Sequence, residues 1–152
     1  MEEFIFRKAE AADAAELARL RECQLKEECA EITCDLYGTL RDFFEESIAD
    51  GGFISWIVEN DGEIIATSGL SFVRKPPYYS NPTGKIGVLS CMYTKPAYRR
   101  RGLSKKLLDI QIEEARTYGC GKVELTASPM GMLLYSDYGF AENKNFVQYV
   151  IR

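Results

Sequence analysis

The first third of the chain contains one alternating segment followed by two segments with helical periodicity. Residues 3–9, EFIFRKA, alternate well enough to predict a strand, and Asp13 stands at the N-cap position of a helix over residues 14–28. Residues 36–50 predict a second helix that ends at Gly51. The apolar stripes are formed by Leu17, Leu20 and Leu25 in the first helix, and by Leu36, Leu40, Phe43, Phe44 and Ile48 in the second.

The middle of the chain predicts a hairpin followed by a buried strand. Segments 53–59 and 64–74 are rich in β-branched and aromatic residues, and they flank an Asp-Gly pair that is typical of tight hairpin turns. Residues 75–85 are dense in proline and glycine and predict a loop. Residues 86–94, IGVLSCMYT, are apolar on both faces, so we expect this strand to lie centrally in the sheet.

The last third predicts a helix, a strand, a short helix and a final strand. The first helix begins at Leu103 and ends near Tyr118, and the short helix precedes Gly139. No repeat, linker or change of composition divides the chain, so we expect one domain over residues 1–152, able to bury roughly two thirds of its unfolded surface. The remaining elements are a strand over residues 122–128, the short helix over 130–138 and a strand over 145–151; Leu107, Leu108, Ile112 and Ala115 are expected to face inward.

The composition favours a packed globule over a disordered chain, with 46% hydrophobic and 12% aromatic residues. No stretch approaches the ~18 uninterrupted apolar residues of a membrane span, and the first residues are acidic where a signal peptide would be basic. We therefore expect a cytoplasmic protein with no membrane partner. Five cysteines without a CxxC spacing are expected to be reduced thiols, with no metal site: Cys23, Cys29, Cys34, Cys91 and Cys120.

The chain contains no histidine, which excludes Ser-His-Asp and Cys-His catalysis and histidine-ligated zinc. Acid–base chemistry must then use tyrosine, cysteine, lysine, carboxylates or water. The net charge of −4 hides an asymmetry, because residues 1–50 contain six Lys and Arg against fourteen Asp and Glu, whereas residues 51–152 contain thirteen against nine. One end of the molecule should favour cations and the other anions.

Positive charge is concentrated in residues 99–106, RRRGLSKK, where five of eight side chains are basic. A strand leads into a tight turn here, and Gly102 stands at the start of the helix that follows. Unpaired backbone N–H groups at the positive end of a helix dipole, with Arg99, Arg100, Arg101 and Lys105 around them, form a site suited to phosphate. The segment matches neither the Walker loop nor the Rossmann loop, so it must hold phosphate in another way.

The segment MYTKPAYRRRGLSKKLL resembles the pyrophosphate-binding motif of the GCN5-related N-acetyltransferase (GNAT) family, because the Q/R-x-x-G-x-G/A pattern of that motif maps onto residues 99–104 and differs only at the last of them. The segment ASPMGMLLYSDYGF resembles the second cofactor motif of that family, with Leu134-Tyr135 and Gly139-Phe140 in the expected places. The order of the predicted elements also agrees. The resemblance implies an α/β (α+β) fold: one GNAT-type domain with a central mixed, mostly antiparallel sheet of about six or seven strands and about four flanking helices.

The resemblance also implies acetyl-CoA as the co-substrate, with its pantetheine arm paired like a missing strand. Backbone groups of Met92, Tyr93 and Thr94 are expected to bind the acetyl carbonyl and the pantetheine amides. Gly102 has no Cβ and allows the pyrophosphate to approach closely. The cofactor-binding residues implied in this way are Met92, Tyr93, Thr94, Arg99, Arg100, Arg101, Gly102, Leu103, Ser104, Lys105 and Ser128.

The family's usual general acid corresponds to Tyr135, which would protonate the coenzyme A thiolate as it leaves. Three positions depart from the family pattern. Ser104 replaces the Gly or Ala of the family pattern. Ser128 lies near the position where many relatives have an asparagine that contacts the cofactor arm, so the residue that makes this contact here is unassigned. Residues 86–94 contain no Asp or Glu, although many relatives carry a general base there, so the base is unassigned.

Several residues have simpler structural readings. The basic segment could be a solvated patch, a localisation signal or a nucleic-acid site, and Tyr135 could be a core side chain. Cys91 could form an acyl intermediate or be a small buried hydrophobic residue. An acidic group near the junction of the first two helices could border the acceptor site or form a solvated surface. The acidic group consists of Glu27, Glu28 and Glu31. Four aromatic residues could line the acceptor pocket or belong to the core, and the alternative of a pocket is strongest for the two tyrosines because they lie in a loop: Trp56, Phe72, Tyr78 and Tyr79.

The leading hypothesis is an acyl-CoA-dependent N-acyltransferase that transfers acetyl directly to a primary amine of a small molecule or peptide. A catalytically silent coenzyme A-binding sensor or regulatory module is the alternative, and turnover distinguishes the two. A nucleic-acid-binding module is a third reading, against which the acidic remainder of the surface speaks. The sequence does not identify the acceptor, and it leaves a homodimer open.

Overall fold

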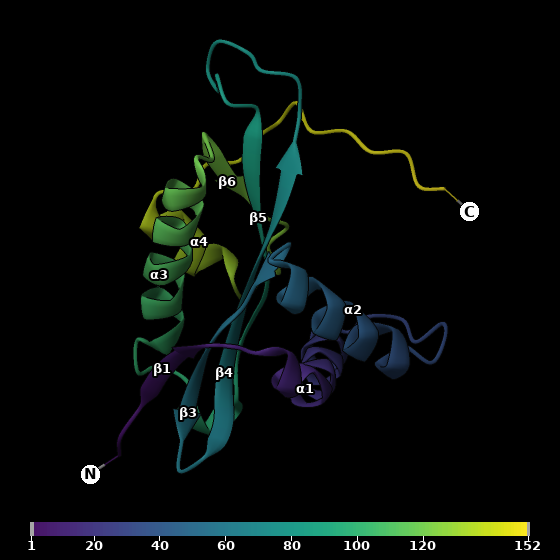
Figure 1. The fold of residues 1–152 in the computed structure, drawn as a ribbon, viewed down its shortest axis with the longest axis vertical. Coiled ribbons are helices and arrows are strands. Elements are labelled where there is room, and N and C mark those ends of the chain that lie inside the picture. The colour runs from purple at the N-terminus through teal and green to yellow at the C-terminus, as the bar shows by residue number, and fades with distance from the viewer. Residues whose placement is uncertain (1, 152) are drawn as a thin grey trace.

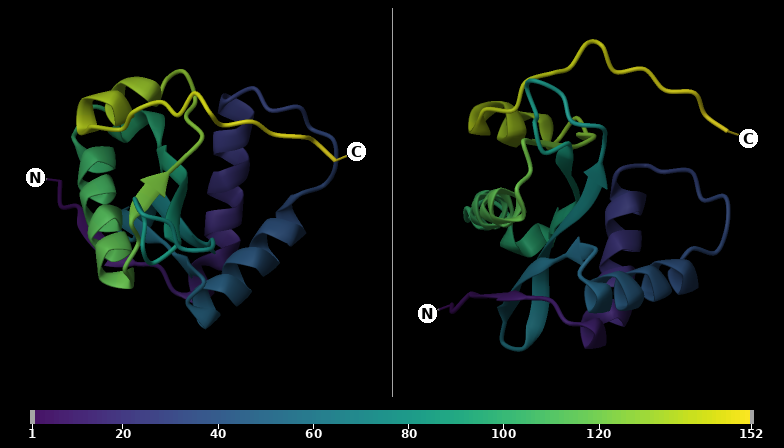
Figure 2. Two further views of the ribbon diagram at one scale, coloured as in Figure 1. Left: turned by 90° about the horizontal axis from the view of Figure 1, so that it is seen from above. Right: turned by 45° about the horizontal axis from the view of Figure 1, so that its top comes forward.

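A mixed, mostly antiparallel sheet lies between two pairs of helices in the computed structural model, which describes residues 2–151. Helices α1 (Ala14–Glu27) and α2 (Tyr37–Asp50) cover one face, and α3 (Leu103–Tyr118) and α4 (Met132–Tyr138) lie on the other (Figures 1 and 2). This arrangement of the described residues confirms the predicted fold class.

Within residues 2–151 the sheet has six strands in the order β1-β3-β4-β5-β6, and β2 pairs with β4 in line with β3. All pairs are antiparallel except β5 with β6. The strands are β1 (Ile5–Lys8), β2 (Phe53–Ile54), β3 (Trp56–Asn60), β4 (Glu63–Arg74), β5 (Lys85–Thr94) and β6 (Lys122–Glu124), and short 3-10 turns η1 (Ala11–Asp13) and η2 (Pro96–Tyr98) precede α1 and α3.

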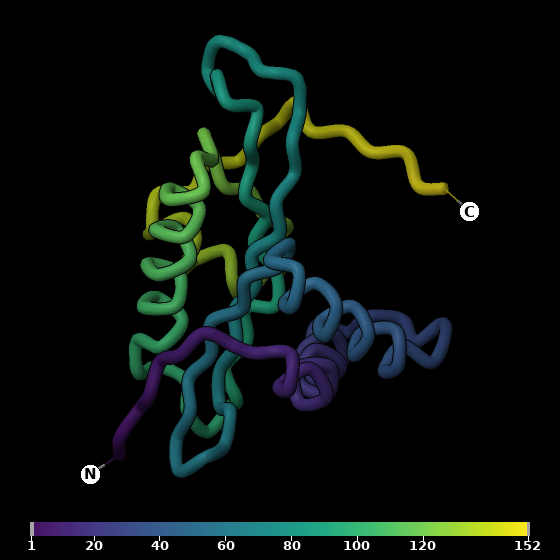
Figure 3. The backbone as a smooth tube through the Cα atoms, viewed as in Figure 1, coloured from purple at the N-terminus to yellow at the C-terminus, as the bar shows by residue number. Residues whose placement is uncertain are grey.

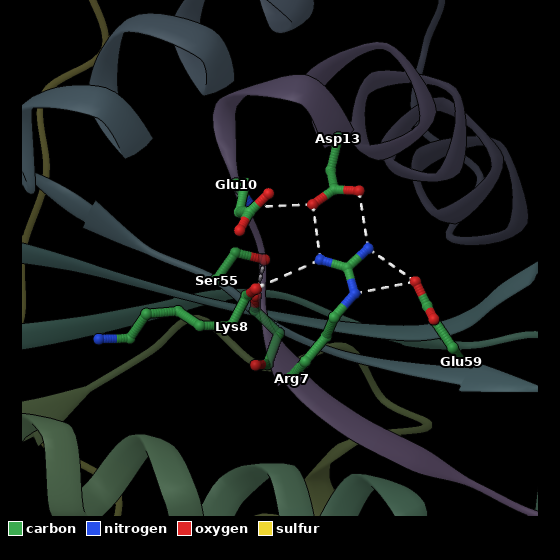
Figure 4. A network of polar contacts seen from close by, with 7 residues as sticks. Arg7, Lys8, Glu10, Asp13, Ser55 and Glu59 are labelled. Carbon is green, nitrogen blue, oxygen red and sulfur yellow. Dashed lines mark hydrogen bonds and ion pairs between the residues drawn. The ribbon is translucent and has the colours of Figure 1, made fainter. Parts of the chain in front are cut away.

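Asp13 occupies the predicted N-cap position of α1, but its side chain does not cap that helix. Its carboxylate accepts two hydrogen bonds from the Arg7 guanidinium at 2.8 and 2.9 Å and one from the Glu10 amide at 2.8 Å (Figure 4). Arg7 also donates to Glu59 on β3 at 2.7 and 2.8 Å. Hydrogen bonding to Arg7 holds the pKa of Asp13 below its usual value, against the opposing effect of burial. The network fixes the start of α1 to β1 and β3.

The predicted hairpin is confirmed as β3 and β4. Asp61 and Gly62 both have positive φ, at 51° and 76°, as a two-residue type I′ turn requires. Asn60 and Glu63 are the last pair before the turn.

Strand β5 is irregular in a way that its sequence does not indicate. It pairs with β4 over its length, but β6 pairs only with its residues Ile86–Val88, so the predicted central position holds for that end alone. Gly69 lies opposite Ser90 and Thr67 opposite Tyr93, so β5 has one more residue than β4 in this interval, a β-bulge. Cys91 in the bulge has φ of 57°, and its carbonyl accepts a hydrogen bond from the Thr67 hydroxyl at 2.7 Å. Beyond Val88, β5 separates from β6.

Helix α3 packs on the sheet as its pattern predicts. Leu107, Leu108 and Ala115 are buried, and Ile112 is partly buried. The fully buried amide of Gln111 donates to the Ile54 carbonyl at 3.0 Å and to the Ser68 hydroxyl at 2.9 Å, which fixes α3 where β2 gives way to β3. No helix in residues 2–151 combines the length and apolar character needed to cross a bilayer.

Two predictions for the C-terminal region were wrong. The strand expected over residues 122–128 is limited to Lys122–Glu124, because only these residues find a partner in β5. Residues 145–151 form no strand; they leave the body as an extended segment without a partner strand in the described chain (Figure 3). The helix expected over residues 130–138 is observed as Met132–Tyr138.

Candidate functional site

A cleft of about 410 Å³ lies between the C-terminal end of α1, the second half of β5, the start of α3 and α4. It gathers the predicted site residues from two segments about thirty positions apart in the sequence. All of them except Arg101 line the cleft: Met92, Tyr93, Thr94, Arg99, Arg100, Gly102, Leu103, Ser104, Lys105, Ser128 and Tyr135. The other lining residues are Gln24, Glu27, Glu28, Tyr98, Met130, Gly131 and Leu134.

The separation of β5 from β6 frees one edge of β5 inside the cleft. Lys95 donates its amide to the Ile65 carbonyl at 2.9 Å, which makes this a hydrogen-bonded pair of the antiparallel ladder. By alternation Tyr93 directs its backbone groups to β4, whereas Met92 and Thr94 direct theirs to the free edge. The Met92 carbonyl accepts a hydrogen bond from the Gln24 side-chain amide at 3.1 Å, and the Thr94 carbonyl accepts one from the Arg99 guanidinium at 2.8 Å. The N–H groups of Met92 and Thr94 are therefore the donors offered to a ligand, and Tyr93 contributes its side chain.

The N-terminus of α3 opens into the same cleft. Gly102 is the N-cap residue with φ of 75°, and no side chain caps the helix. Apart from its chain neighbours, no protein atom lies within 4 Å of a Cβ built at Gly102, so the space beside this residue is open. The first-turn N–H groups of α3 have no partner within the helix. Lys105 and Arg100 are exposed beside it and form no ion pair within residues 2–151. This combination can hold an anion.

The two other arginines of the basic segment have protein partners. Arg99 pairs with Glu27 at 2.7 Å and lies over the Tyr93 ring at 5.7 Å. Arg101 turns away from the cleft, pairs with Glu2 and lies over the rings of Phe4 and Tyr98. The side chain of Arg101 therefore lies outside the cleft, because the N-terminal segment supplies an acid and a ring that the local sequence did not show.

Ser104 and Ser128 also differ from expectation in their partners. The Ser104 hydroxyl lies 3.0 Å from the Thr94 hydroxyl, so it joins α3 to β5 and is already hydrogen-bonded. The Ser128 hydroxyl accepts from the Gly131 amide at 3.2 Å and stabilises the turn before α4. Both residues shape the cleft wall.

Tyr135 lies on α4 with its ring packed edge-to-face on Phe140 at 5.6 Å, and the residue is 8% exposed. Its hydroxyl makes no hydrogen bond within residues 2–151, and the residue lines the cleft. Burial, and secondly the Glu28 carboxylate, raise the pKa of Tyr135 above its usual value of about 10. The hydroxyl therefore keeps its proton at neutral pH and can act as a donor.

The end of α1 brings two carboxylates to the cleft in different states. The Glu27 carboxylate already has two partners, because it accepts a hydrogen bond from the Tyr93 hydroxyl at 3.0 Å and forms an ion pair with Arg99. Burial and this hydrogen bond raise the pKa of Tyr93 to about 12. Glu28 forms no ion pair within residues 2–151 and accepts only a long hydrogen bond from Gln24, at 3.3 Å. Gln24 thereby links Glu28 to the Met92 carbonyl. The sequence singled out Glu28 only as one of several acids; its access to the cleft depends on contacts distant in sequence.

The remaining candidates lie outside the cleft. Glu31 lines a separate hollow beside α1 and α2. Burial raises the pKa of the Cys91 thiol, which opposes a role as nucleophile. Phe72 stacks on Tyr118 at 3.8 Å. None of the four aromatic candidates lines the cleft, and the loop that carries Tyr78 and Tyr79 joins the far ends of β4 and β5.

Several known proteins are similar to this chain in sequence and in fold. The model of the acetyltransferase (GNAT) family matches residues 15–140. An uncharacterized N-acetyltransferase, YjgM of Escherichia coli (strain K12), is 30% identical over 92 residues, which cover 59% of this chain and 52%, about half, of that protein. The crystal structure of a predicted acetyltransferase from Clostridium acetobutylicum with acetyl-CoA matches this fold with a TM-score of 0.93 and 32% sequence identity. The match covers 97% of this chain and 96% of that protein. A GCN5-related N-acetyltransferase from Ralstonia eutropha JMP134 has a TM-score of 0.85 and 25% identity, over 97% and 99% of the two chains.

Proposed function

Because the chain belongs to the acetyltransferase (GNAT) family, we propose that it is an N-acyltransferase of one domain that transfers acetyl from acetyl-CoA directly to a primary amine. The observation that carries this proposal is the convergence in one cleft of a free strand edge, an uncapped helix N-terminus and a buried phenol. These are a donor set for amides, a site for pyrophosphate and a proton donor for a leaving thiolate.

Acetyl-CoA fits the cleft as a substrate in three places. The N–H groups at the start of α3, with Arg100 and Lys105 nearby, receive the pyrophosphate, and Gly102 leaves the space for it. The free edge of β5 receives the pantetheine amides as a neighbouring strand would. The N–H group of Met92 polarises the thioester carbonyl near the bulge at Cys91.

The chemistry then follows from two side chains. The amine nitrogen forms a bond to the carbonyl carbon, and the carbon–sulfur bond breaks as the tetrahedral intermediate collapses. The electron pair leaves on sulfur, and the Tyr135 hydroxyl donates the proton that makes it a thiol. Glu28 attracts the cationic amine to the cleft and accepts the proton whose loss makes the nitrogen nucleophilic. The second proton, which the nitrogen loses after it has attacked, returns through water to Tyr135 and restores its hydroxyl. Glu28 thus fills the role that no residue of β5 can fill.

A catalytically silent coenzyme A-binding module is the second candidate, because β5 carries no Asp or Glu. Thiol release over a panel of amines separates the two. A silent module would bind coenzyme A and release no free thiol with any amine, whereas we expect release that depends on the amine.

Acetyl-CoA should stabilise the folded protein strongly, while ATP and NAD should do so weakly. A ligand at a hundred times its dissociation constant adds about 2.7 kcal/mol to the free energy of unfolding, which corresponds to a rise of roughly 5–10 °C in melting temperature for a chain of this size. Thermal unfolding with each nucleotide measures the difference. An equal shift with ATP would count against a site built for coenzyme A.

The acceptor should be a cationic amine rather than an acidic one. Glu28 faces the cleft from the C-cap of α1, in the acidic third of the chain, so kcat/KM for a diamine should exceed that for an amino dicarboxylate, most clearly at low salt. Glu28→Gln should reduce this preference by up to about fivefold. Glu31→Gln is the matched control, because Glu31 lies outside the cleft and should leave the preference unchanged. Equal rates for both amines in the wild type would refute the assignment.

A further inference from the structure

Gln24 connects helix α1 to strand β5 at the wall of the cleft. It lies in the last turn of α1 and is buried, with 7% of its surface exposed. Its Nε2 group donates to the Met92 carbonyl at 3.1 Å and to the Glu28 carboxylate at 3.3 Å, and its Oε1 atom accepts from the Arg21 guanidinium at 2.8 Å. Both N–H groups and the oxygen of this one side chain therefore have partners.

A carboxamide is the side-chain group that satisfies these three partners at once. A guanidinium accepts no hydrogen bond, so it lies at the amide oxygen, whereas a carbonyl and a carboxylate each require an N–H group. The partners thereby fix which way the amide of Gln24 points. A glutamate at this position would have no N–H group to offer, and a methionine would leave all three contacts unmade.

The amide of Gln24 stands between a cation and an anion. Arg21 and Glu28 are seven positions apart, which is two turns of a helix, and therefore lie along the same face as Gln24. Neither forms an ion pair within residues 2–151. Burial raises the pKa of the Cys91 thiol, Arg21 lowers it and Glu28 raises it, so both charges lie close to the bulge of β5. The two charges are held at opposite ends of one neutral group.

The neighbouring acid shows what a direct ion pair does at this cleft. One carboxylate oxygen of Glu27 pairs with Arg99 at 2.7 Å, and the other accepts from the Tyr93 hydroxyl at 3.0 Å. Glu28 has a neutral amide where Glu27 has a guanidinium, so its carboxylate stays available to the ammonium group of an amine. The difference between two adjacent acids thus depends on Gln24.

We infer that Gln24 is a positioning residue, which keeps Arg21 from pairing with Glu28 and so reserves that carboxylate for the acceptor. The inference rests on the function proposed above, in which Glu28 holds a cationic amine. Arg21 is then a competitor of the substrate, because without the amide its guanidinium takes the place of the substrate's ammonium group. The hydrogen bond to the Met92 carbonyl anchors the amide to β5 and keeps it between the two charges.

Gln24→Met should reveal this competition, because methionine is unbranched and has a similar helix propensity but no amide. A competing group inside the protein weakens binding of the amine and is displaced when the amine saturates. KM for a diamine should therefore rise about threefold to fivefold, while kcat changes by less than about twofold. The affinity for acetyl-CoA, measured by isothermal titration, should stay nearly unchanged and shows that the variant is folded.

The rescue of Gln24→Met by a second substitution separates positioning from mere support of the fold. Arg21→Met alone should have little effect on KM, because Arg21 does not line the cleft. In the Gln24→Met background it should return KM to within about twofold of the wild type, since the competitor is gone. Arg19→Met is the matched control on the same helix, because Arg19 pairs with Glu16 outside the cleft and its removal should rescue nothing.

Each other outcome overturns the inference. A wild-type KM in Gln24→Met, a loss confined to kcat, or a loss that Arg21→Met does not relieve leaves the proposed function intact and removes Gln24 from it. Relief by Arg19→Met as well means that any lost positive charge favours the amine. A Gln24→Met variant that no longer binds acetyl-CoA makes Gln24 a residue that supports the fold. A wild type that releases no thiol with any amine overturns the proposed function, and this inference with it.

Discussion

Replacing Tyr135 by phenylalanine should lower turnover by about 100-fold or more, while the affinity for acetyl-CoA stays nearly unchanged. The hydroxyl meets the leaving sulfur fully only as the carbon–sulfur bond breaks, so its loss affects the transition state more than the ground state. The ring remains in place against Phe140, so the packing of α4 should survive. Single-turnover measurement of thiol release separates chemistry from product release.

The pH dependence follows from the direction of the pKa shift. Burial and Glu28 raise the pKa of Tyr135, so its proton is present at neutral pH and is lost only above the ordinary value of about 10. We therefore expect no fall in the wild-type rate from Tyr135 ionisation below that pH. A fall near neutral pH that disappears in Tyr135→Phe would contradict this assignment.

Tyr138→Phe is the matched control on the same helix. The Tyr138 hydroxyl donates to Asp109 on α3 at 2.8 Å, and the residue does not line the cleft. Its variant should lose a surface hydrogen bond and keep wild-type turnover. If Tyr135→Phe also kept wild-type turnover under conditions where chemistry limits the rate, Tyr135 would be a core residue and water would protonate the thiolate.

Features set by neighbouring residues could be predicted from the sequence. The Asp61-Gly62 turn requires two positive φ angles that few other pairs adopt, and Gly102 marks the start of α3 for the same reason. The positions of the helices could be predicted from the spacing of their apolar residues, whose side chains pack against the sheet. The basic segment and Tyr135 could be placed in one cleft because a known family carries both motifs in this order.

Features set by distant residues could not be predicted. The bulge at Cys91 depends on the Thr67 hydroxyl twenty-four positions away. The access of Glu28 to the cleft follows from Gln24, which reaches the Met92 carbonyl across sixty-eight positions. Arg101 was assigned to the cofactor site because its neighbours are basic, but Glu2 and Phe4 hold its side chain elsewhere. Residues 145–151 do have a strand pattern, but they pair with no strand of the described chain.

Replacing Gly102 by valine should weaken acetyl-CoA binding by about 100-fold or more. The added side chain would fill the space in front of the α3 N-terminus, where the structure has no protein atom within 4 Å of a Cβ. Hydrogen bonds to a charged group contribute about 1.5–3 kcal/mol each, so the loss of two of them gives a loss of this size. Isothermal titration with acetyl-CoA measures it.

The positive φ of Gly102 requires a control, because valine is strained there whether or not a ligand binds. Gly51, which ends α2 outside the cleft, has φ of 81° and equally open space, against 75° for Gly102. Gly51→Val and Gly102→Val should therefore lose similar free energies of unfolding, about 1–2 kcal/mol, in urea titrations. Only Gly102→Val should lose affinity for acetyl-CoA. If the two variants bound acetyl-CoA equally well, the pyrophosphate would lie away from the N-terminus of α3, and the basic segment would need another role.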